Sequence, residues 1–138
     1  MLELVDADTQ AFHQIMLSLA MPKSTLEEKA SRHVALQQAT RFAIQVPLQA
    51  MKAALGSMDA ILAMAETGNP NSVSDAGVAA LCARSAVMGA FLNVRINAKG
   101  LEDKSFLSSV LMEGNEIQEK AIAAEARILA LALSRIDS

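Results

Sequence analysis

The sequence has 138 residues with a formal net charge of −3, and 52% of its residues are apolar. This length predicts a single domain, residues 1–138, and the absence of a Lys/Arg block excludes a nucleic-acid-binding surface, which needs clustered positive charge. Cys82 is the only cysteine, so no internal disulfide can form, and because no signal-peptide pattern starts the chain we expect a cytoplasmic protein.

The residue types and their spacing predict an all-α protein. Helix-favouring residues dominate, and no run alternates between apolar and polar residues as a half-buried strand would. Turn-forming clusters at 21–24, 68–71 and 99–100 divide the chain into about four helices. No capping residue precedes Leu2, so we expect the chain to begin inside the first helix, which continues to about Ala20. This helix carries an apolar arc made of Val5, Phe12, Ile15, Met16 and Leu19.

The second predicted helix is the longest, from about Thr25 to Thr67. Thr25 and Glu28 have the spacing of a capping box, in which each side chain bonds to the backbone of the other residue. Pro47 removes one backbone hydrogen bond in the middle of the helix and is expected to kink it. At ~1.5 Å per residue the rod is roughly 60 Å long. A helix of this length must pack against other helices or subunits along its whole length.

The third and fourth predicted helices, about 74–98 and 103–136, are strongly apolar. The third has almost no solvent-facing side, and its longest apolar stretch, 76–92, is interrupted by Arg84, so we expect a buried helix and not a membrane span. One stripe of it carries small, amide or acid side chains: Asp75, Ala79, Cys82, Ala86, Gly89, Asn93 and Asn97. The fourth carries a bundle seam: Phe106, Val110, Ile117, Ala121, Ala124, Ile128 and Leu131. Together these patterns predict a long-helix bundle completed by oligomerisation, as a homodimer or higher homo-oligomer.

Asp8 is the candidate catalytic residue. In helical projection it falls between Ile15 and Leu19, at the centre of the apolar arc of the first helix. Desolvation there disfavours the charged form of a carboxyl group, which makes the group useful for proton transfer near neutral pH. The alternative is an acid that lies near water at the helix end or in a buried ion pair.

The loop at 68–75 contains a first group of candidate binding residues, Asn69, Asn71, Ser74 and Asp75. Ser72 and Asp75 have the spacing of a second capping box, so the loop is either a well-capped helix connection or an anion or amide site at a helix N-terminus.

The end of the third helix contains a second group, Asn93, Arg95 and Asn97. A buried amide needs partners, which a ligand or a neighbouring subunit can supply. Arg84 shares a helix face with Arg95, so the two guanidinium groups either grip a carboxylate together or form inter-helix salt bridges. The scattered His13, His33 and Cys82 have no metal-binding spacing, and we expect neither a metal nor a cofactor.

Five strings resemble one known family in chain order: LVDAD at 4–8, Pro22-Lys23, VPL at 46–48, GNPNSVSD at 68–75 and NVRIN at 93–97. They are similar to the folate cyclodeaminase/cyclohydrolase family, which includes the cyclodeaminase domain of formiminotransferase-cyclodeaminase and stand-alone methenyltetrahydrofolate cyclohydrolases. The resemblance implies an all-helical, dimeric enzyme that acts on the N5–N10 bridge of a tetrahydrofolate derivative, with Asp8 as the general acid/base. It does not separate a cyclodeaminase, which releases ammonia, from a cyclohydrolase, which adds water.

The family pattern has a Gly-rich stretch and further helices before the LVDAD string, and this sequence does not contain them. The chain therefore resembles the C-terminal two-thirds of such a domain. The alternative to an enzyme is a non-catalytic helical oligomerisation module or folate-binding module.

Overall fold

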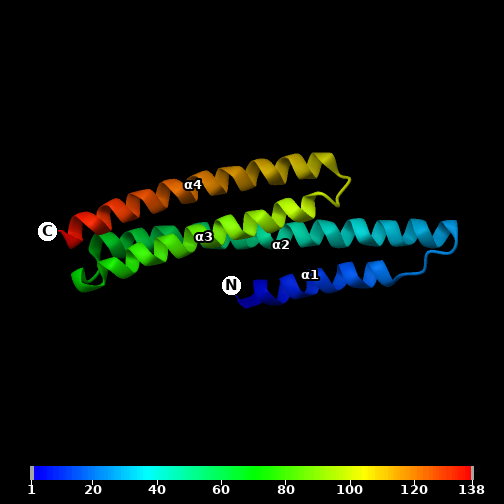
Figure 1. Cartoon of the computed structure of the whole chain (residues 1–138), viewed down its shortest axis with the longest axis horizontal. Coiled ribbons are helices and arrows are strands. Elements are labelled where there is room, and N and C mark those ends of the chain that lie inside the picture. Colours follow the sequence, from blue (N-terminus) through cyan, green and yellow to red (C-terminus); the bar gives the residue numbers. More distant parts are fainter. Residues whose placement is uncertain (1, 138) are drawn as a thin grey trace.

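The computed structural model describes residues 2–137, and of Leu2 only the backbone. Four long helices run alternately up and down in this part of the chain, with no strand among them (Figure 1). The elements in order are α1 (Leu2–Ala20), α2 (Leu26–Thr67), the 3-10 turn η1 (Pro70–Ser72), α3 (Val73–Ala98) and α4 (Lys104–Ile136). The prediction of an all-α bundle of about four helices is confirmed.

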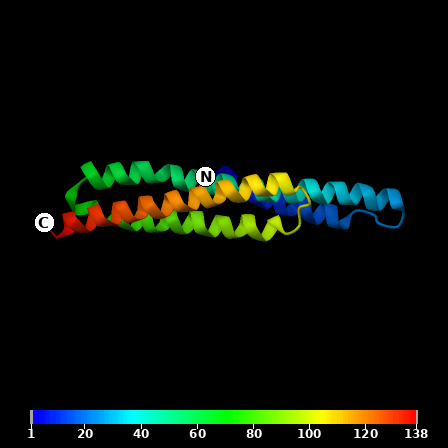
Figure 2. The ribbon, with the colours of Figure 1, turned by 90° about the horizontal axis from the view of Figure 1, so that it is seen from above.

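Helix α2 is the longest helix, and each of the other three helices packs against it. Helix α1 packs along its first half, whereas α3 and α4 pack along its second half, and the two sets overlap near its middle (Figures 1 and 2). Pro47 lies inside α2, is buried, and does not end the helix. The long rod predicted from the sequence is therefore covered by different helices along its length.

Side chains close the ends of the helices. The capping box is confirmed, because Thr25 Oγ1 accepts from Glu28 N–H at 3.1 Å while Glu28 Oε2 accepts from Thr25 N–H at 3.1 Å. At the other end of α2, Arg135 Nη1 donates to Ala65 O at 2.6 Å and to Glu66 O at 3.0 Å. Carbonyl groups in the last turn of a helix have no intrahelical donor, so Arg135 ties the end of α4 to the end of α2.

The second predicted capping box is wrong. Ser72 stands at the N-cap of α3, but its side chain makes no capping hydrogen bond. Asn69 Oδ1 instead accepts from Asn71 N–H at 3.0 Å and organises the turn η1. The short 3-10 turn replaces the capping box as the start of α3.

The main core lies between α2, α3 and α4, with Ile44, Met51, Val87, Val94 and Ile128 fully buried. Each such side chain contributes roughly 1.5–3 kcal/mol through burial. The predicted seam of α4 is confirmed, because all its members are buried or partly buried in this core: Phe106, Val110, Ile117, Ala121, Ala124, Ile128 and Leu131.

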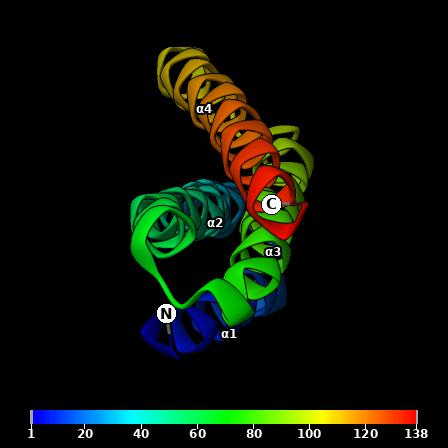
Figure 3. The same cartoon turned by 90° about the vertical axis from the view of Figure 1, so that its left-hand side faces the viewer.

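Two apolar helix faces have no cover among the residues that the structure describes. The first is the arc of α1, on which Val5 and Phe12 are 65% and 66% exposed. The second is on α3, where Val78, Leu81, Leu92 and Ile96 are exposed. Seen along the bundle, α2 and α4 lie near α3 and leave another side of this helix open (Figure 3). The expectation that α3 is covered on all sides is wrong for a single chain, because α2 and α4 cover only one side of it.

Candidate functional site

Asp8 lies on the border between two faces of α1. On one side, Ala7 and Ala11 pack against Ala43 and Val46 of α2. On the other side begins the uncovered apolar arc, and Asp8 itself is exposed. The expected burial of Asp8 is therefore not found in the part of the chain that the structure describes, where α1 packs mainly against α2.

A groove of about 540 Å³ opens beside Asp8, between α1, α2 and α4. Leu4 and Ala7 line it, and because Leu4 precedes Asp8 by one helical turn, the two side chains are neighbours on α1. This volume is within the range of small-molecule sites. Asp8 itself does not line this groove, but it lies one helical turn from Leu4, which does.

The polar groups of this groove come from α2 and α4. Lys52 Nζ lies 2.7 Å from Glu113 Oε1, and Gln45, Gln49 and Ser109 add amide and hydroxyl groups along the apolar wall. Amides and hydroxyl groups can both donate and accept hydrogen bonds, as the edge of a heteroaromatic ring requires. The sequence analysis missed these residues, because polar side chains on a long helix have no signature of their own.

The GNPNSVSD residues lie at the far end of the bundle. Asn69, Asn71, Ser74 and Asp75 are all exposed around the connection between α2 and α3. Along α3, Asp75 is separated from Asn93 by about 27 Å, at ~1.5 Å per residue. A single chain therefore does not bring this loop together with the other end of α3.

Asn97 makes its contact within the chain. Its Nδ2 donates to Ala43 O of α2 at 2.9 Å, so this amide donor holds two helices together and is not free for a ligand. Because Ala43 also packs against Ala11, Asn97 lies at the same level of the bundle as Asp8. Asn93 is exposed on the neighbouring part of α3. One N–H of Asn97 is therefore used within the chain, and substrate binding by Asn97 stays a prediction.

The two arginines of α3 have different surroundings. Arg84 Nε lies 3.1 Å from Glu125 Oε2 on α4, although its N–H is not aimed well enough to form a hydrogen bond. Glu125 is only 8% exposed, so this is the inter-helix salt bridge that the sequence left as an alternative. The guanidinium group of Arg95 lies 5.7 Å above the ring of Phe91 and is otherwise exposed. Arg84 is thus paired within the chain, whereas Arg95 stacks on an aromatic ring.

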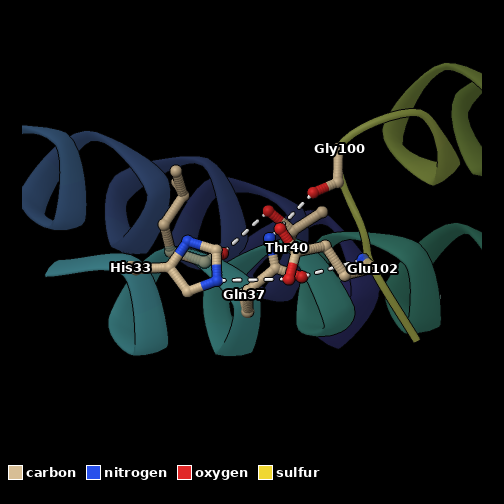
Figure 4. Close-up of polar contacts among 6 residues, drawn as sticks. His33, Gln37, Thr40, Gly100 and Glu102 are labelled. Atoms are coloured by element: carbon tan, nitrogen blue, oxygen red, sulfur yellow. Dashed lines mark hydrogen bonds and ion pairs between the residues drawn. The ribbon is translucent and has the colours of Figure 1, made fainter. Parts of the chain in front are cut away.

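A polar cluster that the sequence did not predict fixes the α3–α4 connection to α2 (Figure 4). Gln37 Nε2 donates to Gly100 O at 3.0 Å, and Gln37 Oε1 accepts from Glu102 N–H at 2.9 Å. His33 Nε2 lies 3.2 Å from Glu102 Oε2. One amide side chain thus satisfies both a donor and an acceptor of the connection.

Asp103 extends this cluster to the start of α4. Its Oδ1 accepts from Phe106 N–H at 3.0 Å, and its Oδ2 lies 2.9 Å from Arg41 Nη1. The backbone hydrogen bond from Phe106 and then the contact with Arg41 lower the pKa of Asp103 below its ordinary value. Arg41 also lies 4.1 Å above the Phe106 ring, so one arginine holds both the cap and the first turn of α4.

Comparison with known proteins decides the family. The sequence model described as formiminotransferase-cyclodeaminase matches residues 1–116. The chain belongs to the formiminotransferase-cyclodeaminase family. This confirms the resemblance that the five strings carry.

Individual members of the formiminotransferase-cyclodeaminase family match along nearly the whole chain. A methenyltetrahydrofolate cyclohydrolase of Methylorubrum extorquens is 38% identical over 94% of this chain and 62% of its own length. A formimidoyltransferase-cyclodeaminase of Gallus gallus is 35% identical over 93% of this chain and 24% of its own. A crystal structure of a formiminotetrahydrofolate cyclodeaminase from Thermotoga maritima matches with a TM-score of 0.82 and 25% identity, over 97% of this chain and 63% of that one. The chain thus spans less than two thirds of each of these relatives.

Proposed function

We propose that the chain acts in cytoplasmic folate one-carbon metabolism, as a formimino-tetrahydrofolate cyclodeaminase or a methenyltetrahydrofolate cyclohydrolase, with Asp8 as general acid/base. The observation that carries this proposal is the position of Asp8, which lies beside the exposed Val5 and Phe12 and one helical turn from Leu4, a residue that lines the groove between α1, α2 and α4. The relatives, a methenyltetrahydrofolate cyclohydrolase and a formimidoyltransferase-cyclodeaminase, supply the substrate class.

One carboxyl group at this position can serve either reaction. In the cyclodeaminase reaction, N10 attacks the formimino carbon, a C–N bond forms, and the acid gives a proton to the nitrogen that leaves as ammonia. In the cyclohydrolase reaction, the carboxylate accepts a proton from the water that adds to the methenyl carbon. The same proton then goes to N5 as the bond between N5 and that carbon breaks, while the hydroxyl group on the carbon loses its proton to solvent and becomes the carbonyl group of 10-formyl-tetrahydrofolate. Neither route needs a metal or an added cofactor.

We also propose that a second copy of the chain covers the arc of α1. The side chains of Val5 and Phe12 in this arc are each about two-thirds exposed, which is unusual for large apolar side chains gathered on one face. Because Asp8 borders the arc, a subunit packed there would remove water from the carboxyl group and favour its protonated form. The homo-oligomer is thus a condition for catalysis in this proposal.

A non-catalytic folate-binding or oligomerisation module is the second candidate. The observation that favours it is the exposure of Asp8, whose carboxyl group lies in water within one chain. The candidate binding residues of the α2–α3 connection lie far from Asp8 within one chain: Asn69, Asn71, Ser74 and Asp75. They could share a site with Asp8 only if a second copy of the chain brought them next to it.

Turnover assays separate the two candidates. Purified protein is mixed with methenyl-tetrahydrofolate or 5-formimino-tetrahydrofolate, and the methenyl absorbance is followed. We expect turnover by the wild type and a loss of roughly 10²–10⁴-fold in Asp8→Asn, because the proton donor is removed. Asp6→Asn, on the other side of the same helix, is the matched control and should keep full activity. An Asp8→Asn variant as active as the wild type would exclude the acid/base role, and wild-type binding of folate without turnover would favour the module.

A further inference from the structure

Eight exposed residues form a seam along the open side of α3 and its C-cap. They follow one another at alternating steps of three and four residues, which keeps them on one face of the helix, as in a coiled coil. Three of them are large and apolar, and these are between 58% and 67% exposed. The members of this α3 seam, in chain order, are Asp75, Val78, Cys82, Ser85, Gly89, Leu92, Ile96 and Lys99.

The α3 seam is complementary to itself when a second copy runs in the opposite direction. In an antiparallel pair of such helices the first member of one seam faces the last member of the other, and the pairing continues inward in the same way. An acid then faces a base, apolar side chains face each other, and two small residues meet next to the two-fold axis. The pairs are Asp75 with Lys99, Val78 with Ile96, Cys82 with Leu92, and Ser85 with Gly89.

The charges at the two ends of the α3 seam favour the antiparallel direction. Neither Asp75 nor Lys99 belongs to an ion pair within the part of the chain that the structure describes. A parallel pair of helices would place Asp75 beside its own copy and Lys99 beside its own copy, and both contacts repel. An antiparallel pair replaces these repulsions by two attractions, and it also places opposite ends of the two helix dipoles side by side.

Gly89 at the centre of the α3 seam is an independent observation. A glycine inside a helix lowers the stability of that helix relative to alanine, so close packing is the usual reason for its presence. The described part of the chain supplies no such packing, because a Cβ at Gly89 would meet no atom within 4 Å. A second α3 helix, with Ser85 of the partner subunit opposite Gly89, would use this space for a close approach of the two backbones.

We propose that two copies of this chain pair through the α3 seam, antiparallel, about a two-fold axis at the level of Val87. The large side chains of Val78, Leu92 and Ile96 are covered on both sides of the axis, and the small residues set the distance between the helices. The occupant of this face is thus a second copy, because the face matches its own sequence in reverse and in no other direction. This interface does not depend on any folate chemistry.

The register also brings the α2–α3 connection of the partner subunit to the level of Asp8. Asn97 is two residues before Lys99, so it is level with the start of α3 in the partner subunit. It is also level with Asp8, because its side chain donates to Ala43 O and Ala43 packs against Ala11. The same copy therefore reaches the arc of α1. One site built from two chains follows, and this consequence alone rests on the proposed function.

Sedimentation of the whole chain measures the Kd of the dimer. Gly89→Leu fills the space at the centre of the α3 seam and should raise this Kd about a hundredfold or more. Because a single chain has room at this position, the variant should still fold, which its circular dichroism checks. Gly56→Leu on α2 is the matched control, since a Cβ there also meets no atom within 4 Å, and it should leave the Kd unchanged. A monomeric wild type, or an unchanged Kd in Gly89→Leu, refutes the seam.

A charge swap tests the direction of the pair. Asp75→Lys and Lys99→Asp each place like charges at both ends of the seam, so each should raise the Kd of the dimer about tenfold. The double variant Asp75→Lys/Lys99→Asp restores unlike charges and should return the Kd to about the wild-type value. A purely structural effect would instead add up, because both substitutions oppose the dipole of α3. A double variant that dimerises more weakly than either single variant overturns the antiparallel register.

Turnover separates this inference from the proposed function. If the wild type is a dimer with these variant effects but turns over neither methenyl-tetrahydrofolate nor 5-formimino-tetrahydrofolate, the seam stands and the catalytic proposal fails. If the wild type turns over folate and Gly89→Leu is monomeric yet fully active, the seam stands and the site built from two chains is refuted.

Discussion

Asn97 on α3 compensates for Pro47 on α2. A helical carbonyl normally accepts from the N–H four residues later, and the residue four after Ala43 is Pro47, which has no N–H. The side chain of Asn97 supplies the missing donor at 2.9 Å from Ala43 O. Asn97 of the NVRIN string thus supplies the hydrogen bond that Pro47 of the VPL string removes, and α2 continues through the proline.

This relationship predicts a strong coupling between the two positions. Asn97→Ala should lower the free energy of unfolding by about 1–3 kcal/mol, because the carbonyl of the buried Ala43 loses its partner. In the background of Pro47→Ala, which restores the backbone N–H, the same substitution should cost much less. Urea unfolding of the wild type, both single variants and the double variant gives the coupling energy, and strictly additive effects would show that the two residues are independent.

Gly114 of α4 lies directly against the ring of Phe91 on α3, and a Cβ at this position would collide with the ring. Gly114→Ala should therefore destabilise the protein by about 1–3 kcal/mol, despite the higher helix propensity of alanine. Gly56→Ala is the control, since a Cβ there meets no atom within 4 Å, and it should stabilise α2 by about 0.5–1 kcal/mol. Thermal or urea unfolding compares the two, and equal effects of both substitutions would contradict the close packing.

Asp103 predicts a pH dependence of stability. Its pKa in the folded chain is lowered below the ordinary 3.8, chiefly by the hydrogen bond from Phe106 N–H. A lowered folded pKa means that the contribution of Asp103 is present above the unfolded pKa and is lost as the pH falls through the folded one. The stability difference between the wild type and Asp103→Ala should thus be full at neutral pH and should shrink below about pH 4. Asp103→Asn, which keeps an acceptor for Phe106 N–H, should lose less at neutral pH, and unfolding curves from pH 2 to pH 7 test both statements.

The arc of α1 predicts a link between assembly and activity. Phe12→Glu places a charge at the centre of this face and should reduce the mass measured by sedimentation to that of a single chain. Turnover should fall with it, because Asp8 then stays in water. Gln10→Glu adds the same charge to the opposite side of α1 and should change neither quantity. A Phe12→Glu variant that is monomeric yet fully active would show that catalysis does not need the covered arc.

The sequence by itself determined the helices. The capping box of Thr25 and Glu28 and the apolar seam of α4 follow from hydrogen bonds and side-chain spacings within three or four residues. The helical pattern on both sides of Pro47 likewise predicts one long helix. Such signals are local and can be read directly from the chain. The position of Asp8 beside an apolar arc belongs to the same class, because it depends only on the helical period.

Only the tertiary structure decided the partners of the polar side chains. Asn97 bonds across 54 positions to Ala43, and Gln37 bonds across 63 positions to Gly100. Arg84 meets Glu125 instead of joining Arg95, because α4 packs against that side of α3. The exposure of Asp8 likewise depends on what lies against α1. These contacts depend on how the helices are placed relative to one another, which no pattern within a single helix specifies.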